Sequence, residues 1–271
     1  MAFTEGELDQ WYQVAKEAAL EAGKVLRRWT GRFSVKEKGR FDLVTEADVE
    51  SQKVIHEFLM GRFPKHNFLG EEGGMEEKPP APGSAPTWIV DPIDGTSNYA
   101  HDFPFYCTSI GLMAEGEMVV GAIYDPTRDE LFHAARGKGA WINGKRIQPS
   151  LAEKPEQSLV TTGFPYNLNG KEELLGWWEH WSWRAQALRR TGSTALNLAY
   201  VAAGRCDAFY ALEGHAWDVA GGMILVKEAG GKITKVKGAP FDPFVPDLLA
   251  TNGKVHDEFV RQFSQGPKGR P

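Results

Sequence analysis

The chain has 271 residues, of which 42% are hydrophobic and 25% charged, and its formal net charge is −5 at pH 7. This length allows one large domain or two domains of moderate size. The acidic balance gives no sign of the basic patch that marks a nucleic-acid-binding protein, and no apolar run approaches the ~20 residues that cross a bilayer. We therefore expect neither nucleic acid nor a membrane among the partners.

The cysteine content and the first residues indicate the cellular compartment. Cys107 and Cys206 are the only cysteines, too few for a disulfide framework in a chain of this length. The first ten residues are acidic and lack the basic and apolar regions of a signal peptide. A cytoplasmic location is expected.

The first part of the chain begins with helical patterns. Apolar residues recur at helical spacing over Glu7–Trp29 and again over Ala47–Arg62, which predicts two amphipathic helices. Val35–Val44, rich in Lys, Arg and Gly, is expected to be a mobile strand or loop. A short strand is expected at Asn67–Leu69, and Met75–Pro86 contains four prolines and no period, so it is expected to be a surface loop.

Strand patterns dominate the next part of the chain, before residue 150. The strands are expected at Thr87–Asp91, Thr108–Met113, Val119–Tyr124, Leu131–Ala135 and Ala140–Ile147. Asp125-Pro126 and Asn143-Gly144 are the turns, and Asn-Gly is a strong hairpin signal. Asp125 is interpreted as a surface or turn residue, as are Asp42, Glu46 and Glu72.

Strands and helices alternate after residue 150. The expected elements are a strand at Ser158–Thr162, helices at Lys171–Trp183 and Ser193–Ala203, a strand at Ala208–Leu212, a helix at Val219–Glu228 and a strand at Lys232–Lys235. The polar stretch around residue 150 divides the chain into domains 1–150 and 151–271. Four tryptophans fall between positions 177 and 183. A buried helix face explains two of them, and the others fit a dimer contact or ordinary packing equally well.

The most informative stretch of the sequence is W-I-V-D-P-I-D-G-T, residues 88–96. An apolar run ends in two carboxylates, Asp91 and Asp94, and Pro92 stiffens the turn between them. Gly95 and Thr96 follow, where a helix can begin. Hard divalent cations prefer oxygen ligands, and a helix start offers free N–H groups to a phosphate. The stretch therefore predicts a site for Mg²⁺ and a phosphate, although the same residue types also make plain turns.

Other residues are candidates for the same site. Glu71 follows a short strand in F-L-G-E-E-G-G, and Asp218 and Asp48 stand near expected helix starts. Each of these two aspartates also fits an ordinary helix N-cap. Gly192-Ser193-Thr194, preceded by Arg189 and Arg190, forms a second helix start that suits either a ligand's hydroxyl groups or a plain Ser/Thr cap.

Several other active-site motifs are excluded. Residues 139–145 match most of a P-loop, but Arg146 stands where a Ser or Thr should bind Mg²⁺. No dinucleotide-binding G-x-G-x-x-G follows a strand, and no G-x-S-x-G nucleophile elbow is present. The seven histidines show no zinc spacing, and most are expected on the surface.

Taken in order, several motifs make up a family pattern. They are D-L-V-T-E-A-D, G-E-E-G, W-I-V-D-P-I-D-G-T-S-N-Y, G-F-P, R-R-T-G-S-T-A-L-N and W-D-V-A-G-G-M-I-L-V-K-E-A-G-G. Over residues 38–231 the chain resembles the inositol monophosphatase family of Mg²⁺-dependent, lithium-sensitive phosphatases. The resemblance implies an α+β or α/β fold, a layered α-β-α-β-α sandwich of the sugar-phosphatase type. It also implies two or three Mg²⁺ ions and a homodimer.

The resemblance implies roles for individual residues. The metal ligands are expected to be the carboxylates of Glu71, Asp91, Asp94 and Asp218 and the backbone carbonyl of Ile93. Thr96 and Asp48, together with Glu71, are expected to help activate the attacking water. Gly95 and Thr96 match the phosphate cradle; Gly192, Ser193 and Thr194 match the segment that touches the alcohol part of the substrate. Lys38 matches a basic residue on a mobile loop near the metals.

One position departs from the family pattern. Ala211 stands where inositol-preferring members carry a Glu for the ring hydroxyls, and Glu213 lies two residues later, where it can substitute with different geometry. The resemblance thus implies a phosphomonoesterase for a small polyol phosphate such as inositol monophosphate. A histidinol-phosphate or fructose-1,6-bisphosphate phosphatase on the same fold is the first alternative. A regulatory binding protein of the same family is the second.

Overall fold

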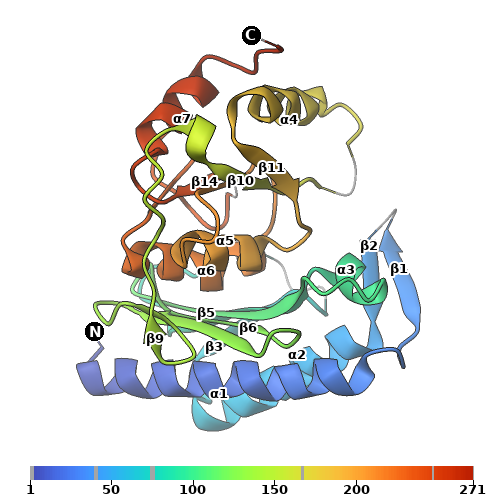
Figure 1. The fold of residues 1–271 in the computed structure, drawn as a ribbon. Coiled ribbons are helices and arrows are strands. Elements are labelled where there is room, and N and C mark those ends of the chain that lie inside the picture. Colours follow the sequence, from blue (N-terminus) through green and yellow to red (C-terminus); the bar gives the residue numbers. More distant parts are fainter. Residues whose placement is uncertain (1–2, 40–41, 74–76, 166–167, 246, 271) are drawn as a thin grey trace.

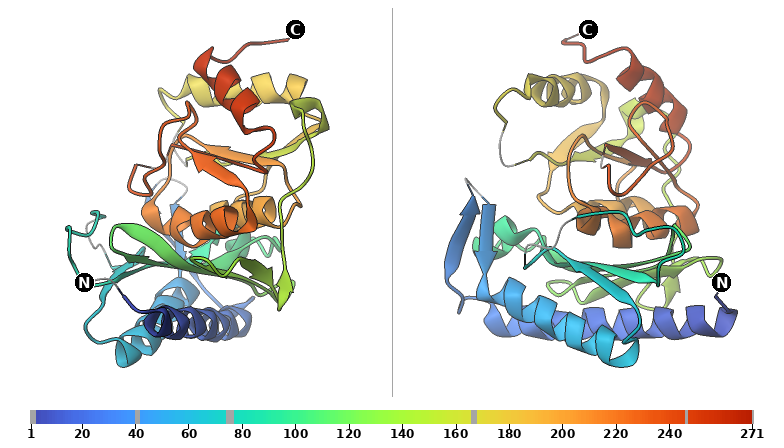
Figure 2. Two further views of the ribbon diagram at one scale, coloured as in Figure 1. Left: turned by 90° about the vertical axis from the view of Figure 1, so that its left-hand side faces the viewer. Right: turned by 180° about the vertical axis from the view of Figure 1, so that it is seen from behind.

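The secondary-structure elements of the chain stack in five layers, as the computed structural model shows for residues 3–39, 42–73, 77–165, 168–245 and 247–270 (Figure 1). A helical layer lies under a seven-stranded sheet, a second helical layer separates this sheet from a five-stranded one, and a third helical layer covers the far side (Figures 1 and 2). The predicted α-β-α-β-α sandwich is therefore confirmed.

Helices α1 (Glu5–Trp29) and α2 (Glu46–Arg62) form the first layer, and both begin with capping boxes. Thr4 accepts a hydrogen bond from the backbone of Glu7, whose carboxylate accepts one from the Thr4 backbone. Such reciprocal caps satisfy N–H groups that a helix start leaves free. The segment expected as a strand or loop is a hairpin of β1 (Val35–Gly39) and β2 (Asp42–Thr45).

The seven-stranded sheet contains most of the first half of the chain. Its order is β3-β4-β5-β6-β7-β8-β9, with β3 and β4 parallel and the other pairs antiparallel. Its strands are β3 (Asn67–Gly70), β4 (Thr87–Asp94), β5 (Cys107–Ala114), β6 (Glu117–Asp125), β7 (Glu130–Ala135), β8 (Ala140–Ile142) and β9 (Lys145–Arg146). Because helices cover both faces, every residue of β4 and β5 is buried, which explains their continuous apolar runs.

The middle layer consists of α5 (Thr194–Ala202) and α6 (Ala216–Ala229), which pack between the two sheets. Helix α6 approaches the larger sheet at Gly121, where an added Cβ would lie 2.3 Å from the carbonyl oxygen of Gly221. A side chain at position 121 would push the two backbones apart. This close contact fixes the position of α6, and with it that of the residues in its first turn.

The five-stranded sheet has the order β11-β10-β12-β14-β13. Its strands are β10 (Leu159–Thr162), β11 (Ala187–Arg190), β12 (Ala208–Ala211), β13 (Lys232–Thr234) and β14 (Leu248–Thr251). The first three are mutually parallel, while β14 runs antiparallel to β12 and β13. A 3₁₀ turn, η1 (Pro155–Gln157), precedes β10. The sequence analysis did not predict β11 or β14.

The outer helices are α4 (Glu172–Arg184) and α7 (His256–Ser264), and α7 was also not predicted. Trp177 and Trp181 are buried, and Trp181 stacks on Phe259 with ring centroids 4.1 Å apart. Trp178 packs against Phe164, whereas the Trp183 side chain is exposed. A buried helix face thus accounts for two of the four tryptophans, as expected.

The two sheets separate along the chain close to the expected domain boundary. The last strand of the larger sheet ends at Arg146, and the first of the smaller sheet begins at Leu159. The α5 and α6 layer packs against both sheets, since residues of both helices share one apolar cluster with residues of β5, β6 and β12. The division into domains 1–150 and 151–271 stays a prediction.

Two expectations about polar residues are confirmed only in part. Asp125 is at a turn, but it is fully buried, because its carboxylate accepts hydrogen bonds from the backbone of Thr127 and Arg128 and pairs with the Arg128 guanidinium. Of the seven histidines, His56, His101 and His215 are exposed and His66 is half-buried. Three of the seven, His133, His180 and His256, are buried, each with a hydrogen-bond partner.

The buried His256 predicts a pH-dependent contribution to stability. Burial lowers the pKa of His256 to about 4, below its usual 6.5. The unfolded chain therefore binds more protons than the folded chain between these values, and the histidine costs stability as pH falls from 6.5 to 4. We expect the stability advantage of wild type over His256→Gln to shrink by about 1–3 kcal/mol between pH 7 and pH 4.5 in urea unfolding. An advantage that grows as the pH falls would contradict this assignment.

Candidate active site

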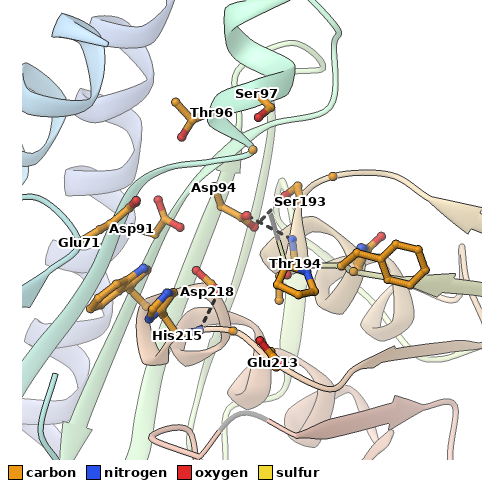
Figure 3. A pocket seen from close by; sticks show the side chains of 18 of the residues that line it. Glu71, Asp91, Asp94, Thr96, Ser97, Ser193, Thr194, Glu213, His215 and Asp218 are labelled. Carbon is orange, nitrogen blue, oxygen red and sulfur yellow. Dashed lines mark hydrogen bonds between the residues drawn. The ribbon is translucent and has the colours of Figure 1, made fainter. Parts of the chain in front are cut away.

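A cavity of about 1080 Å³ lies where β4, β12 and the starts of α3 (Thr96–Ala100), α5 and α6 come together (Figure 3). The lining includes most of the candidate site residues of the sequence analysis: Glu71, Asp91, Ile93, Asp94, Gly95, Thr96, Gly192, Ser193, Thr194, Glu213 and Asp218. The fold thus gathers residues from both halves of the chain around one space.

A bulge in β4 brings Asp91 and Asp94 to the same cavity. Asp91 pairs with Ser109 of β5 and Asp94 with Cys107, so three steps on β4 face two on β5. In a regular strand, residues three apart point to opposite faces, whereas one extra residue restores the same face. The strand therefore continues through Asp94. The expected turn at Pro92 is wrong, because Pro92 lies inside β4 at the bulge, where proline is tolerated.

The buried aspartates of the cavity have raised pKa values. Burial and the charges of Glu71, Asp94 and Asp218 hold the pKa of Asp91 well above its usual range. Burial and the charge of Asp94 do the same for Asp218. Among the described residues, the buried Oδ1 of Asp91 has no hydrogen-bond partner. Buried carboxylates without such partners are costly unless a cation offsets them.

Asp94 differs from the other acids because the start of α5 holds it. Ser193 Oγ donates to Asp94 Oδ2 at 2.8 Å, and Thr194 N–H donates to Oδ1 at 3.2 Å (Figure 3). Ala195 N–H also donates to Oδ2. Burial raises the pKa of Asp94 to about 6, although these hydrogen bonds act in the opposite direction. Asp94 therefore links the β4 bulge in the first half of the chain to α5 in the second.

The Ser193 side chain is a helix cap as well as a contact of Asp94. Its Oγ accepts a hydrogen bond from Leu196 N–H at 3.2 Å, so the ordinary cap interpretation is confirmed. Gly192, just before it, has φ of 92°, and an added Cβ would lie 2.8 Å from Asn98 Nδ2. Asn98 donates to the carbonyls of Phe105 and Thr191. The amide of Asn98 thereby ties the start of α3 to the start of α5.

Asp48 lies beside the cavity, behind Thr96. It is fully buried in the first turn of α2, where its Oδ2 accepts hydrogen bonds from the backbone and hydroxyl of Thr45 at 2.7 and 2.6 Å. Thr45 is the N-cap, so Asp48 is the third residue of the helix and not the cap itself. The Thr96 hydroxyl is 3.3 Å from Asp48 Oδ1 and 3.0 Å from the Ile93 carbonyl oxygen, and it can donate to either. Burial raises the pKa of Asp48 to about 7.

Asp218 is likewise the third residue of its helix, α6, with its side chain at the cavity. Its Oδ2 accepts a hydrogen bond from His215 N–H at 2.9 Å. The expected N-cap role for Asp218 is therefore wrong, because His215 occupies that position. Its carboxylate nevertheless satisfies an N–H group at the helix start, as an acid in the first turn often does.

The cavity lining also includes apolar side chains. They are Phe164, Leu168, Leu212, Trp217 and Val245, and Arg190 adds a basic side chain. Ala211 is buried in β12, and Glu213 reaches the lining, where it forms an ion pair with Lys171. The backbone of Lys38 lies in β1, whereas its side chain lies outside the described part of the structure.

Sequence reasoning missed several residues of the site. Asn98, His215 and Trp217 all line the cavity, and Glu77 approaches His215 from a distant loop. Asn98 stands inside the D-G-T-S-N-Y motif. Its position just after the expected helix start could have identified it as a residue of the site. Glu77 lies in the proline-rich loop, and no local pattern predicts its contact with α6.

The buried carboxylate of Asp91, whose Oδ1 has no hydrogen-bond partner among the described residues, predicts that the site lowers the stability of the metal-free chain. Asp91→Asn is expected to stabilise the protein in EDTA at pH 7.5 by about 1–2 kcal/mol, because it removes a buried charge that faces other carboxylates. The raised pKa also makes wild type more stable as pH falls, and the variant should lose that part of the pH dependence. Urea unfolding of both proteins tests this, and a variant less stable than wild type would refute it.

Comparisons with known proteins identify the family of the chain. Residues 7–268 match the model of the inositol monophosphatase family. "Inositol monophosphatase 3" of Solanum lycopersicum is 41% identical over 269 residues, covering 96% of this chain and 98% of the relative. "Fructose-1,6-bisphosphatase/inositol-1-monophosphatase" of Aquifex aeolicus is 37% identical over 262 residues, covering 95% and 97%. The crystal structure of the extragenic suppressor protein suhB from Bartonella henselae has a TM-score of 0.85 at 38% identity, covering 92% and 96%.

The fold and the acidic cavity thus define a phosphatase of the layered sandwich class. The chain belongs to the inositol monophosphatase family, a family of metal-dependent phosphatases. No helix in the described ranges has the length and apolar character needed to span a bilayer.

Proposed function

We propose that the protein is a Mg²⁺-dependent phosphomonoesterase that hydrolyses inositol monophosphate or a similar small polyol phosphate to the alcohol and inorganic phosphate. One observation carries the proposal: four carboxylates, from Glu71, Asp91, Asp94 and Asp218, line one cavity together with two helix starts. A phosphate dianion would be repelled there unless cations outweigh the carboxylates.

The donor set suits Mg²⁺, which prefers oxygen ligands. Glu71, Asp91, Asp94 and Asp218 would hold the ions, with the carbonyl oxygen of Ile93, and the unpartnered Oδ1 of Asp91 supports this assignment. No group of three or more His, Cys, Asp or Glu residues in the described part of the chain is already arranged as a metal cluster. Two or three bound Mg²⁺ would supply positive charge that offsets the negative charge of the phosphate. The same positive charge would promote the ionisation of a bound water.

Thr96 and Asp48 would manage the proton of the attacking water, together with Glu71. The Thr96 hydroxyl lies between Asp48 Oδ1 and the carbonyl of Ile93, so it can pass a proton to the carboxylate while it accepts one from water. With a pKa of about 7, Asp48 is suited to a general base near neutral pH. This assignment accounts for a fully buried carboxylate behind the cavity wall.

The two helix starts would orient the substrate. The first turn of α3, at Gly95 and Thr96, offers backbone N–H groups to the phosphate. Gly192, Ser193 and Thr194 lie beside it and would contact the alcohol part, with Glu213 farther along the wall. Lys38 is expected to approach from the β1–β2 hairpin.

A fructose-1,6-bisphosphate phosphatase is the second candidate, because two observations favour it. Ala211 replaces the carboxylate that would select inositol, and Arg190 lines the alcohol end, where a guanidinium can bind a second phosphate. One relative carries both activities in its name. Histidinol phosphate is a further candidate substrate of the same site. A regulatory binding protein of the same family would instead capture a partner protein from cell extract and hydrolyse none of these substrates.

The proposal includes a cytoplasmic homodimer that is inhibited by lithium. Two buried free cysteines suit a reducing compartment. The exposed Trp183 and Leu175 of α4 offer an apolar patch for a second copy. Light scattering during size-exclusion chromatography measures the molecular mass. A titration of the phosphatase activity with lithium measures the inhibition.

Phosphate release from a panel of substrates tests the function. The panel is inositol 1-phosphate, glycerol 2-phosphate, histidinol phosphate, fructose 1,6-bisphosphate and 3′-phosphoadenosine 5′-phosphate, each with Mg²⁺ and with EDTA. We expect turnover only with Mg²⁺, and less than a hundredfold preference for inositol 1-phosphate. Absence of Mg²⁺-dependent turnover on the whole panel would overturn the proposed substrate class.

A further inference from the structure

Glu77 lies apart from the cavity lining, yet it contacts the helix that bears Asp218. Its carboxylate accepts a hydrogen bond from the backbone N–H of Ala216, the first residue of α6, and lies 2.8 Å from Nδ1 of His215. The Glu77 side chain is 23% exposed. A carboxylate at this place satisfies a free N–H group and interacts favourably with the helix dipole.

His215 connects this contact to the cavity. Its backbone N–H donates to Asp218 Oδ2 at 2.9 Å, and its ring stacks on Trp217 with centroids 4.6 Å apart. The residue is thus held at its ring by Glu77 and Trp217, and at its backbone by Asp218 (Figure 3 shows the last contact). A change in the position of His215 therefore changes the orientation of the Asp218 carboxylate.

The contact also joins two segments that are distant in sequence. Glu71 stands six residues before Glu77 on the segment that leaves β3, and Asp218 stands in the second half of the chain. Glu71 and Asp218 lie close enough for the charge of Glu71 to raise the pKa of Asp218, after burial and Asp94.

We propose that Glu77 is a positioning residue: through His215 and the first turn of α6 it holds Asp218 at the spacing from Glu71 that a divalent cation requires. The inference rests on the proposed metal-dependent function. Groups that orient a metal ligand without touching the metal commonly change its affinity by about 10- to 100-fold. The charge of Glu77 also acts on Asp218, but we expect its hydrogen bonds to have the larger effect on cation affinity.

Calorimetric titration of the metal-free protein with Mn²⁺ tests the proposal, alongside the Mg²⁺ concentration that gives half-maximal activity. Glu77→Ala is expected to weaken the tightest site about tenfold or more, with kcat at saturating Mg²⁺ within about threefold of wild type. Glu77→Gln keeps an acceptor for Ala216 N–H and a partner for His215, so its affinity is expected within about threefold of wild type.

Glu228→Ala is the matched control, because Glu228 ties a loop to the other end of α6 by accepting hydrogen bonds from Gly137 and Gly139 N–H, both at 2.9 Å. It should lower the melting temperature without changing the Mn²⁺ affinity. His215→Ala should weaken Mn²⁺ binding as Glu77→Ala does, and the double variant should lose less than the sum. If Glu77→Ala does not fold, His215→Ala provides the affinity measurement.

Two outcomes would overturn the positioning role. Unchanged Mn²⁺ affinity in Glu77→Ala would leave Glu77 a helix cap only, and Glu77→Gln as weak as Glu77→Ala would show that the charge itself attracts the cation. Failure of the proposed function is a separate result. In that case wild type itself would show no Mg²⁺-dependent turnover, whatever the variants bind.

Discussion

Asp94→Asn is expected to lower kcat/KM by about 1,000-fold, which corresponds to about 4 kcal/mol of transition-state stabilisation. The proposed role of Asp94 requires a negative oxygen toward the cation, and the amide removes that charge. The protein should stay folded, because the remaining oxygen still accepts from Ser193 Oγ and Ala195 N–H at the start of α5. Steady-state kinetics with circular dichroism on the same samples measures both effects.

The control for this change is Asp257→Asn. Asp257 pairs with Lys232 at the surface, does not line the cavity, and has a side chain that is 89% exposed. The control should retain wild-type kinetics. Activity of Asp94→Asn within tenfold of wild type would remove Asp94 from the metal ligands and would leave it a capping residue of α5.

Gly95→Ala is expected to reduce both stability and activity. The residue has φ of 101°, and an added Cβ would lie 3.1 Å from the Phe105 carbonyl oxygen and 3.3 Å from that of Gly192. The left-handed backbone and these contacts together should cost about 2–4 kcal/mol of unfolding free energy. Since the start of α3 must shift, we expect kcat/KM to fall about 100-fold.

Gly116→Ala separates the effect of the left-handed backbone from the effect of the close contacts around the added Cβ. Gly116 also has a positive φ, 79°, but an added Cβ there meets no atom within 4 Å. It should cost only the backbone term, about 1 kcal/mol, and leave the activity unchanged. Urea unfolding and kinetics compare the two variants. If Gly95→Ala loses no more unfolding free energy and activity than Gly116→Ala, the close contacts at the start of α3 do not matter.

The sequence predicted the elements with strong periodicity and missed those that depend on a partner. The helix over Glu5–Trp29 was expected within two residues, because its apolar positions and capping residues are local signals. Strand β14 has four residues, Leu248–Thr251, and becomes a strand by pairing between β12 and β13. A short apolar run of this kind fits a helix equally well without its neighbours.

For the site, the motifs located the residues but not their geometry. Asp91 and Asp94 were expected to flank a turn, and only their pairing with β5 shows that a bulge places both at the cavity. Asp48 was expected either as a helix cap or as a catalytic residue. It completes the cap of α2 and also reaches Thr96. Contacts between distant segments, such as Glu77 with His215, leave no local pattern to read.

The cavity acids come from both halves of the chain, on β4 and on α6, and this arrangement has a thermodynamic consequence. An unfolded chain keeps these carboxylates apart, so a cation that binds them binds the native state alone. By mass action, free cation at a hundred times its dissociation constant would add about 2.7 kcal/mol to the unfolding free energy. The melting temperature of such a protein would report the magnesium level of its surroundings.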